Sequence, residues 1–335
     1  MRTVPGFGAV LFLATLAVRT SVVAQAPISP AWAYGVEPDA PVVTTPPAPR
    51  TTPAVPPAPD TSLKRIPGST KEFTLAHIRD FWDVGDWFPD DHPTMPGVVV
   101  HGRQPHVRGC AMCHMPNGKG RPENAPVSGQ PYAYIAQQLM DFKNGLRASS
   151  DPRKANTAQM IEAAVDMTDD EIKEAATYFS SMKWTPWITV RESATVPKTR
   201  LGGNVFLPLP GDETEPIGNR IVEAPEDVTR FELRDPRSGF IAYVPPGSLQ
   251  KGAALVASGG GKTVPCGVCH GVDLNSLGPV PGIAGRSPSY LMRQLWDIKQ
   301  GTRKGAWSPL MKPVVENLTQ DDMLAIVAYV AAQGR

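Results

Sequence analysis

Two short stretches decide the fold of this chain: Cys110-Ala-Met-Cys113-His114 and Cys266-Gly-Val-Cys269-His270. They contain all four cysteines of the 335 residues, so no thiol lies outside the pattern. The pattern C-x-x-C-H is the attachment signature of c-type haem, because two thiols at this spacing reach both vinyl groups and the adjacent histidine meets the iron. The sequence therefore predicts two covalently bound haem c groups.

Three other uses of these cysteines fit less well. A zinc site would need two C-x-x-C pairs close in sequence or a pair of histidines. A redox dithiol of the thioredoxin kind would lie in a βαβ pattern, which this sequence lacks. Disulfide bonds would not explain the histidine that follows each second cysteine.

The two motifs belong to an internal repeat. Five residues after the first motif recur after the second at the offset that separates Cys110 from Cys266, which is 156 residues. The pairs are Gly129 and Gly285, Tyr134 and Tyr290, Leu139 and Leu295, Gly145 and Gly301, and Arg147 and Arg303. After a five-residue shortening, the match resumes with Met160 and Met311, Thr168 and Thr319, and Tyr178 and Tyr329. One ancestral domain therefore occurs twice in the chain.

The repeat also selects the sixth ligands of the irons. His270 is the last histidine of the chain, so a second histidine from its own copy cannot ligate the second haem. Among the methionines, only Met160 and Met311 occupy a shared position, whereas the others face different residue types and fit ordinary core packing. We predict His114, Met160, His270 and Met311 as metal ligands. An iron with both axial positions filled exchanges electrons and binds no substrate, which favours an electron carrier.

The secondary structure that the sequence predicts is mainly helical. Gln130-Pro131 and Ser287-Pro288 precede apolar residues at helical spacing, and Thr168 and Thr319 begin capping boxes of two closing helices. A further helix is expected from Ser248 to Ala257. Between the copies, residues 183–247 form a long irregular segment with minor β pieces, such as 204–207 and 239–244, which we expect to pack along both copies.

The N-terminal residues indicate export. Residues 1–26 have the positive start, the apolar run and the Ala24-Gln25-Ala26 cleavage site of a signal peptide, with an uncleaved membrane anchor as the alternative. Residues 27–67 contain 12 prolines and are predicted to be a disordered tether. We therefore expect the two domains, at 68–182 and 248–335, to lie in the periplasm. A formal net charge of +1 disfavours a strongly basic nucleic-acid binder.

These motifs together resemble a class I cytochrome c, and the tandem arrangement is similar to the dihaem cytochrome c4 family of electron-transfer proteins. The match covers residues 109–182 and about 248–333. The resemblance implies haem attachment at the four cysteines, proximal ligation by the motif histidines and distal ligation by Met160 and Met311. A proline carbonyl orients the proximal ring in such folds; Pro281 fits this role, and the role stays open in the first copy, where Pro126 aligns one place off.

We expect Arg147 and Arg303 to lie near haem propionates, with a solvated helix-end arginine as the alternative. Four histidines precede the first motif, and one of them could replace Met160 or bind a second metal: His77, His92, His101 and His106.

The expected function is electron transfer between a periplasmic or membrane dehydrogenase and a terminal acceptor. Its partners would be redox proteins, including a membrane-bound respiratory complex, and no nucleic acid or small-molecule substrate is expected. Two alternatives remain. The chain could be a dihaem enzyme of the peroxidase or thiosulfate-oxidising type with an open haem in the first domain, or a cytochrome subunit of a respiratory complex.

Overall fold

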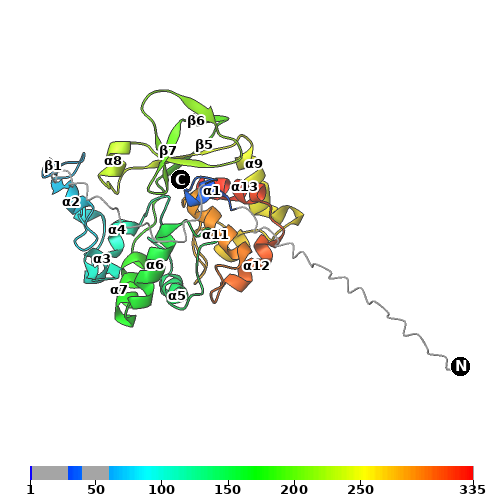
Figure 1. The fold of residues 1–335 in the computed structure, drawn as a ribbon, viewed down its shortest axis with the longest axis horizontal. Helices are drawn as coiled ribbons and strands as arrows, with labels where there is room; N and C mark the ends of the chain where they lie inside the picture. The colour runs from blue at the N-terminus through cyan, green and yellow to red at the C-terminus, as the bar shows by residue number, and fades with distance from the viewer. Residues whose placement is uncertain (2–28, 40–59, 335) are drawn as a thin grey trace.

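Both copies of the repeat build the same four helices in the same order (Figure 1). The structure is a computed structural model that describes residues 1, 29–39 and 60–334. The first copy contains α4 (Cys110–His114), α5 (Tyr132–Lys143), α6 (Ala155–Asp166) and α7 (Asp169–Ser180). The second contains α10 (Gly267–His270), α11 (Pro288–Gln300), α12 (Ser308–Glu316) and α13 (Gln320–Ala331). The prediction of a mainly helical chain is confirmed.

The closing helices begin where the capping signals predict. The hydroxyl of Thr168 accepts a hydrogen bond from the Glu171 N–H, and the Glu171 carboxylate accepts one from the Thr168 N–H. Thr319 and Asp322 form the same reciprocal pair at the start of α13. These bonds satisfy N–H groups that a helix start leaves without partners.

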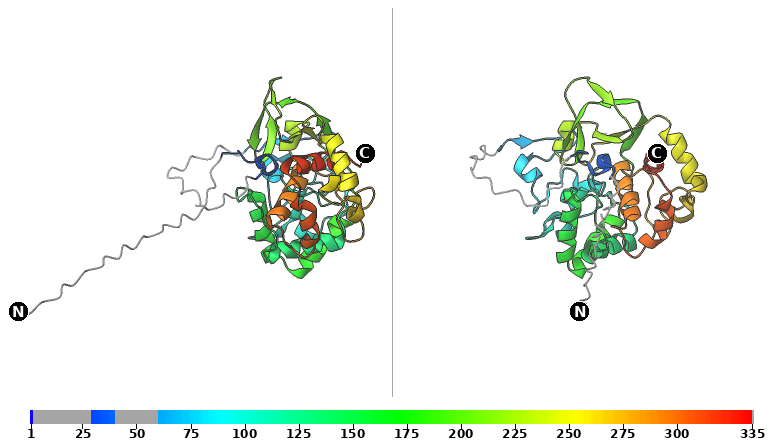
Figure 2. Two further views of the ribbon diagram at one scale, coloured as in Figure 1. Left: turned by 90° about the vertical axis from the view of Figure 1, so that its right-hand side faces the viewer. Right: turned by 45° about the vertical axis from the view of Figure 1, so that its right-hand side comes forward.

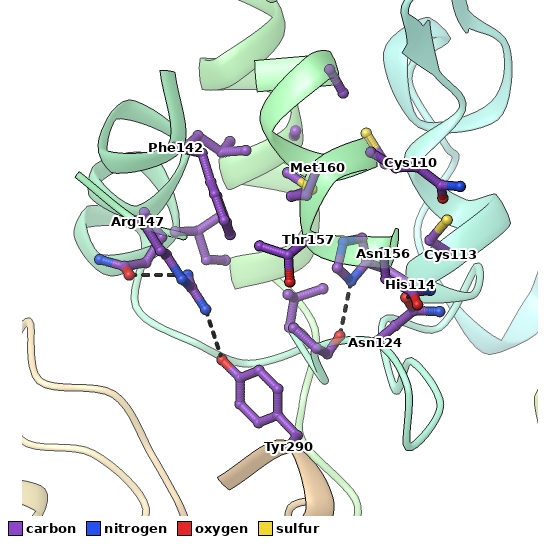
Figure 3. A pocket seen from close by; sticks show the side chains of 18 of the residues that line it. Cys110, Cys113, His114, Asn124, Phe142, Arg147, Asn156, Thr157, Met160 and Tyr290 are labelled. Carbon is purple, nitrogen blue, oxygen red and sulfur yellow. Dashed lines mark hydrogen bonds between the residues drawn. The ribbon is translucent and has the colours of Figure 1, made fainter. Parts of the chain in front are cut away.

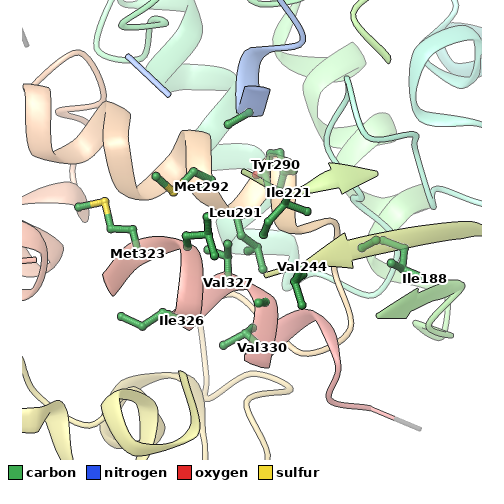
Figure 4. Packing of buried hydrophobic residues seen from close by; sticks show 14 of the residues in the cluster. Ile188, Ile221, Val244, Tyr290, Leu291, Met292, Met323, Ile326, Val327 and Val330 are labelled. Atoms are coloured by element: carbon green, nitrogen blue, oxygen red, sulfur yellow. The ribbon is translucent and has the colours of Figure 1, made fainter. Parts of the chain in front are cut away.

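Helix α9 (Ser248–Ser258) also matches its prediction, and it packs closely against α13. A Cβ atom at Gly252 would lie 2.0 Å from the Ala325 carbonyl oxygen, so only glycine allows this approach. The core around α13 contains Met292 of α11, Met323 of α13 and Val244 of the preceding segment (Figure 4). No helix among the described residues is long and apolar enough to cross a membrane.

The segment between the copies contains more regular β structure than the sequence predicts. β11 (Phe240–Val244) pairs antiparallel with β10 (Val222–Pro225) and parallel with β5 (Ile188–Glu192), so strands far apart in sequence form one sheet. Two further pairs join β7 (Thr199–Gly202) to β8 (Val205–Pro208) and β6 (Thr195–Pro197) to β9 (Thr214–Pro216). The short helix α8 (Val228–Glu232) follows β10.

The segment packs along both copies, as the sequence predicts. Toward the second copy, Val244 and Phe240 belong to the core that contains α11 and α13. Toward the first copy, the Asn117 amide donates to the Pro236 carbonyl and Arg237 pairs with Asp91. Figure 2 shows this strand-rich layer against the helices.

The residues before the first motif are ordered in short pieces where a simple first helix would be expected. They are β1 (Leu63–Lys64), β2 (Phe73–Thr74), α2 (Leu75–Ile78), the 3-10 turn Pro89–Asp91, α3 (Gly97–Val100), β3 (Gly102–Arg103) and β4 (Val107–Arg108). Ile66, Trp87 and Phe88 form a small core of their own. Of these pieces, α3 packs against α4.

The prediction of a disordered tether over 27–67 is wrong for its two described parts. Helix α1 (Ala31–Tyr34) packs on α11, Tyr34 is fully buried, and its hydroxyl donates to Asp297 at 2.7 Å. Leu63 and Lys64 pair with β2. Aromatic residues in a proline-rich stretch supply the apolar surface that this docking buries. The predicted signal peptide and residues 40–59 lie outside the described residues, apart from residue 1.

Candidate haem sites at the two CxxCH motifs

The first motif opens into a cavity that brings its predicted ligands together. Cys110, Cys113 and His114 line it from α4, and Met160 lines it from α6 (Figure 3). Its walls are largely apolar, with Ile135, Leu139, Phe142 and Phe179 among the lining side chains. The cavity holds about 1430 Å³ of space outside protein atoms, including solvent at its mouth.

His114 is oriented by a backbone carbonyl. Its Nδ1–H donates to the Ala125 carbonyl oxygen at 2.8 Å, and its ring meets the Phe179 ring edge-on. Burial lowers the pKa of His114 and outweighs the hydrogen bond to Ala125, which acts in the opposite direction. A neutral ring whose Nδ1 is already bonded leaves Nε2 as the coordinating atom, as in most histidine–metal sites.

The second motif repeats this arrangement. His270 Nδ1–H donates to the Pro281 carbonyl oxygen at 2.8 Å, and burial lowers the pKa of His270. Met311 packs against the same core cluster as Cys266. Ala125 and Pro281 each follow their histidine by eleven positions, so the carbonyl is shared although the proline ring is not. Pro126, one place further on, does not supply the acceptor.

The cysteines lack the features of a redox dithiol or a zinc site. Burial raises the pKa of Cys110 to about 12 and that of Cys266 to about 11, whereas reactive dithiols have lowered values. The four thiols are unbonded, and no group of three or more metal-binding side chains occurs among the described residues. Thiols in this state are available for thioether bonds.

The cationic groups at the cavity fit a cofactor with carboxylates. Lys154 lines the cavity and is buried, and its Nζ has no hydrogen-bond partner. Burial, with Arg293 nearby, holds the pKa of Lys154 well below its usual range. Arg147 also lines the cavity. Neither group donates a hydrogen bond to a carboxylate of this chain, and buried cations are costly without such bonds, so an apolar cavity with both groups on its wall fits haem and its propionates.

Arg147 and Arg303 lie side by side where the two copies meet. An antiparallel bridge joins their backbones. Arg147 donates to Gln138 of its own copy and to Gln294 and Tyr290 of the other. Arg303 donates in the same way to Gln294 and to Gln138 and Tyr134. The two arginines therefore share neutral partners, and neither is paired with a carboxylate in these bonds.

The positive charges of Arg147 and Arg303 change the pKa of the neighbouring Tyr134. Burial opposes ionisation of Tyr134, but Arg303 and Arg147 outweigh it and lower the pKa of Tyr134 to about 8. The roles of Gln138 and Gln294 were not predicted from the sequence. Their signal was present, because the two glutamines are separated by the same 156 positions as the repeat.

The four early histidines are held away from the first cavity. None of them lines it within the described part of the chain. Each has other partners: His92 hydrogen-bonds with Tyr178 and Asp86, His106 with Glu162 and His101 with the Trp82 carbonyl, and the His77 ring meets the Phe73 ring edge-on. The geometry favours Met160 over these histidines as the group that faces His114.

Comparisons with known proteins agree with this site. The family model for cytochrome c matches residues 99–183. A cytochrome c4 of Azotobacter vinelandii is 38% identical over 92 residues, which cover 25% of this chain and 44% of that protein. Cytochrome c-554(548) of Halomonas halodenitrificans is 36% identical over 82 residues, which cover 24% of this chain and 99% of that protein. A thiosulfate dehydrogenase electron acceptor of Thiomonas intermedia is 24% identical over 232 residues, or 68% of this chain and 80% of that protein.

The chain belongs to the cytochrome c family. Part of it is similar to the dihaem cytochromes c4, and its cofactor is covalently bound haem c. The aligned part spans less than half the length of the curated cytochromes c4 that it matches.

Proposed function

We propose that this protein carries single electrons between redox proteins and has no substrate of its own. Cys110 and Cys113 would hold one haem and Cys266 and Cys269 the other. His114 and Met160 would ligate the first iron, and His270 and Met311 the second. Each bound haem supplies reversible one-electron chemistry at iron, and the protein supplies ligation, an apolar pocket and a fixed distance between the two groups.

One observation carries the proposal: the second copy closes the first haem pocket. Tyr290, Arg293, Gln294 and Asp297 of α11 line the cavity that begins at Cys110. Arg147 crosses this boundary by hydrogen bonds of 2.9 Å to Gln294 and 3.4 Å to Tyr290. Helix α11 thus contributes both to the first cavity and to the core against which Cys266 and Met311 pack, an arrangement suited to electron transfer between the two haem groups.

The two copies differ in how far the motif faces solvent, which suggests where partners dock. In the second copy Val268 is 66% exposed and Val272 is 99% exposed, and Cys269 is exposed as well. In the first copy Met112, which matches Val268 in the repeat, is 6% exposed because α3 covers it. We assign exchange with redox proteins to the apolar surface around the second motif, which consists of Val264, Val268, Val272 and Leu277.

The partners follow from this role as a finer proposal. A relative from Thiomonas intermedia carries the name thiosulfate dehydrogenase electron acceptor. We infer that the electron donor is a periplasmic or membrane dehydrogenase and that the acceptor is a terminal redox protein, such as a respiratory complex. The expected location is the periplasm.

A titration of the purified holoprotein tests the proposal. Intact mass should exceed the mature polypeptide by two haems, and reduction should take up two electrons per chain. Carbon monoxide should leave the spectrum of the reduced protein unchanged, because a histidine and a methionine would hold each iron. Carbon monoxide binding to half of the haem would contradict the carrier and favour an enzyme with an open first haem.

A further inference from the structure

The hydrogen bond that orients His270 continues into the other copy of the repeat. The acceptor of the His270 Nδ1–H is the carbonyl oxygen of Pro281. The same peptide group carries the N–H of Gly282, and this N–H donates to Gln130 Oε1 at 3.0 Å. Gln130 belongs to the first copy, just before α5, so a residue of one copy touches the peptide that holds the histidine of the other.

The orientation of the Gln130 amide is determined by its two bonds. Its Oε1 accepts from the Gly282 N–H, and its Nε2 donates to the Gly282 carbonyl at 2.8 Å. The buried Arg286 donates to the same carbonyl at 2.7 Å. Gln130 is 4% exposed, so water does not replace these contacts. Gln130 of the first copy therefore fixes the position of the loop that carries Pro281, through its two hydrogen bonds to Gly282.

The first copy has no equivalent relay. His114 donates to the Ala125 carbonyl, and the nitrogen of that peptide group belongs to Pro126, which has no hydrogen to donate. Arg286 reaches the next carbonyl, that of Pro126, at 2.9 Å. The peptide that faces His114 thus cannot be polarised through its nitrogen.

Hydrogen bonds in a chain polarise one another, so an acceptor at the Gly282 N–H makes the Pro281 carbonyl a stronger acceptor for the His270 Nδ1–H. A stronger bond at Nδ1 raises the electron density of the ring and makes it a more basic ligand. A more basic ligand favours ferric over ferrous iron. This reasoning rests on the proposed ligation of the second haem by His270.

We propose that Gln130 is a positioning residue that lowers the redox potential of the second haem across the boundary between the two copies. The relay acts on one haem only, because its counterpart in the first copy ends at Pro126. Two motifs of the same sequence pattern would therefore hold haems of different potential.

The test compares Gln130→Met with Gln137→Met in the full holoprotein. Methionine matches glutamine in length and removes both bonds to Gly282. Gln137 lies on α5 and contacts Asp141 of the same helix, so it controls for the substitution itself. In Gln130→Met the ferrous-to-ferric ratio of the second haem should rise a few-fold at a fixed solution potential, and that of the first haem, whose cavity Gln130 also lines, should change less. The ¹⁵N and proton signals of His270 Nδ1–H should shift, and those of His114 should not.

Each other outcome overturns a different step. An unchanged second potential, or an equal shift of both haems, would overturn the relay. If Gln130→Met fails to fold, Gln130→Glu keeps an acceptor oxygen, and its His270 signal must move in the opposite sense; an unmoved signal overturns the relay. A wild-type His270 signal without any effect of the haem would instead overturn the ligand assignment of the proposed function.

Discussion

Replacing the buried Glu223 with glutamine should stabilise the protein at neutral pH and leave its stability unchanged at acidic pH. Glu223 lies in β10, where its Oε2 accepts from the Ser287 hydroxyl at 2.8 Å and from the Ser289 N–H at 3.2 Å. Its Oε1 has no hydrogen-bond partner. Burial raises the pKa of Glu223 to about 7, against the two serine bonds, which lower it.

The direction of this change in stability with pH follows from where the folded and unfolded states bind the Glu223 proton. Below pH 4.5, which is the ordinary pKa of a glutamate side chain, Glu223 holds its proton in both the folded and the unfolded state. Between pH 4.5 and about 7 the unfolded state releases it and the folded state keeps it, so the free energy of unfolding falls as the pH rises. At about 1.4 kcal/mol per pKa unit, this rise in pKa from 4.5 to about 7 limits the loss to about 3.5 kcal/mol. Glutamine has no proton to release, so Glu223→Gln avoids this loss.

Urea unfolding of the holoprotein, followed by circular dichroism from pH 4 to pH 8 (about one unit per step), measures the difference. The curves of wild type and Glu223→Gln should coincide near the acidic end and separate as the pH rises, with the variant more stable. Glu226→Gln changes an exposed carboxylate of the same segment and should follow the wild type throughout. Parallel curves for wild type and Glu223→Gln over the whole range would refute the reasoning.

Three further predictions follow from the sites and the helix caps. Met311→Ala should abolish the methionine-to-iron charge-transfer band of the second haem, lower the potential of that haem and leave the covalent haem content unchanged. Met160→Ala should have the same effects at the first haem. A charge-transfer band that survives unchanged in both variants would exclude these two methionines as ligands. Burial raises the pKa of Asp322, but hydrogen bonds from Lys262 and Lys251 outweigh it and hold this pKa below its ordinary value. Asp322→Asn should therefore lower the free energy of unfolding at pH 7 by about 1 to 2 kcal/mol, and urea unfolding should show this loss shrinking as the pH falls below 3.8. Val272→Glu should slow electron self-exchange between copies of the protein, measured by NMR line broadening, whereas Val165→Glu, at an exposed site on α6, should not; equal slowing would contradict docking at the second motif.

The elements that could be predicted from the sequence are those formed by side chains that lie close together along the chain. A C-x-x-C-H motif and a capping box each need side chains within a few positions, so Cys110 to His114 and Thr168 to Glu171 are readable without a structure. The shared methionine position required only the comparison of two copies. The mainly helical fold follows from the same local signals.

Other features depend on contacts between distant residues. Gln130 and Gly282 meet across 152 positions, and a parallel strand pairs 188–192 with 240–244, which no local pattern encodes. The acceptor for His114 is a backbone carbonyl, so the residue type at Ala125 carries no signal for it. Helix α1 was not predicted because the many prolines of residues 27–67 dominate the composition of that segment. The short apolar stretch Ala31–Tyr34 has little weight in such an average.

The differences between the copies explain how one repeated motif can serve two roles. The first motif is covered by α3, and α11 of the second copy lines the cavity beside it, so under the proposed function we expect its haem to exchange electrons mainly through the second copy. The second motif faces solvent through Val268 and Val272, and its histidine is coupled to the first copy through Gln130. Under the proposed relay, removing the Gln130 bond should raise the potential of the second haem and shift electrons toward it. Removing the exposed apolar surface should instead slow exchange with other proteins and leave the distribution of electrons between the two haems unchanged, so the two features can be tested separately.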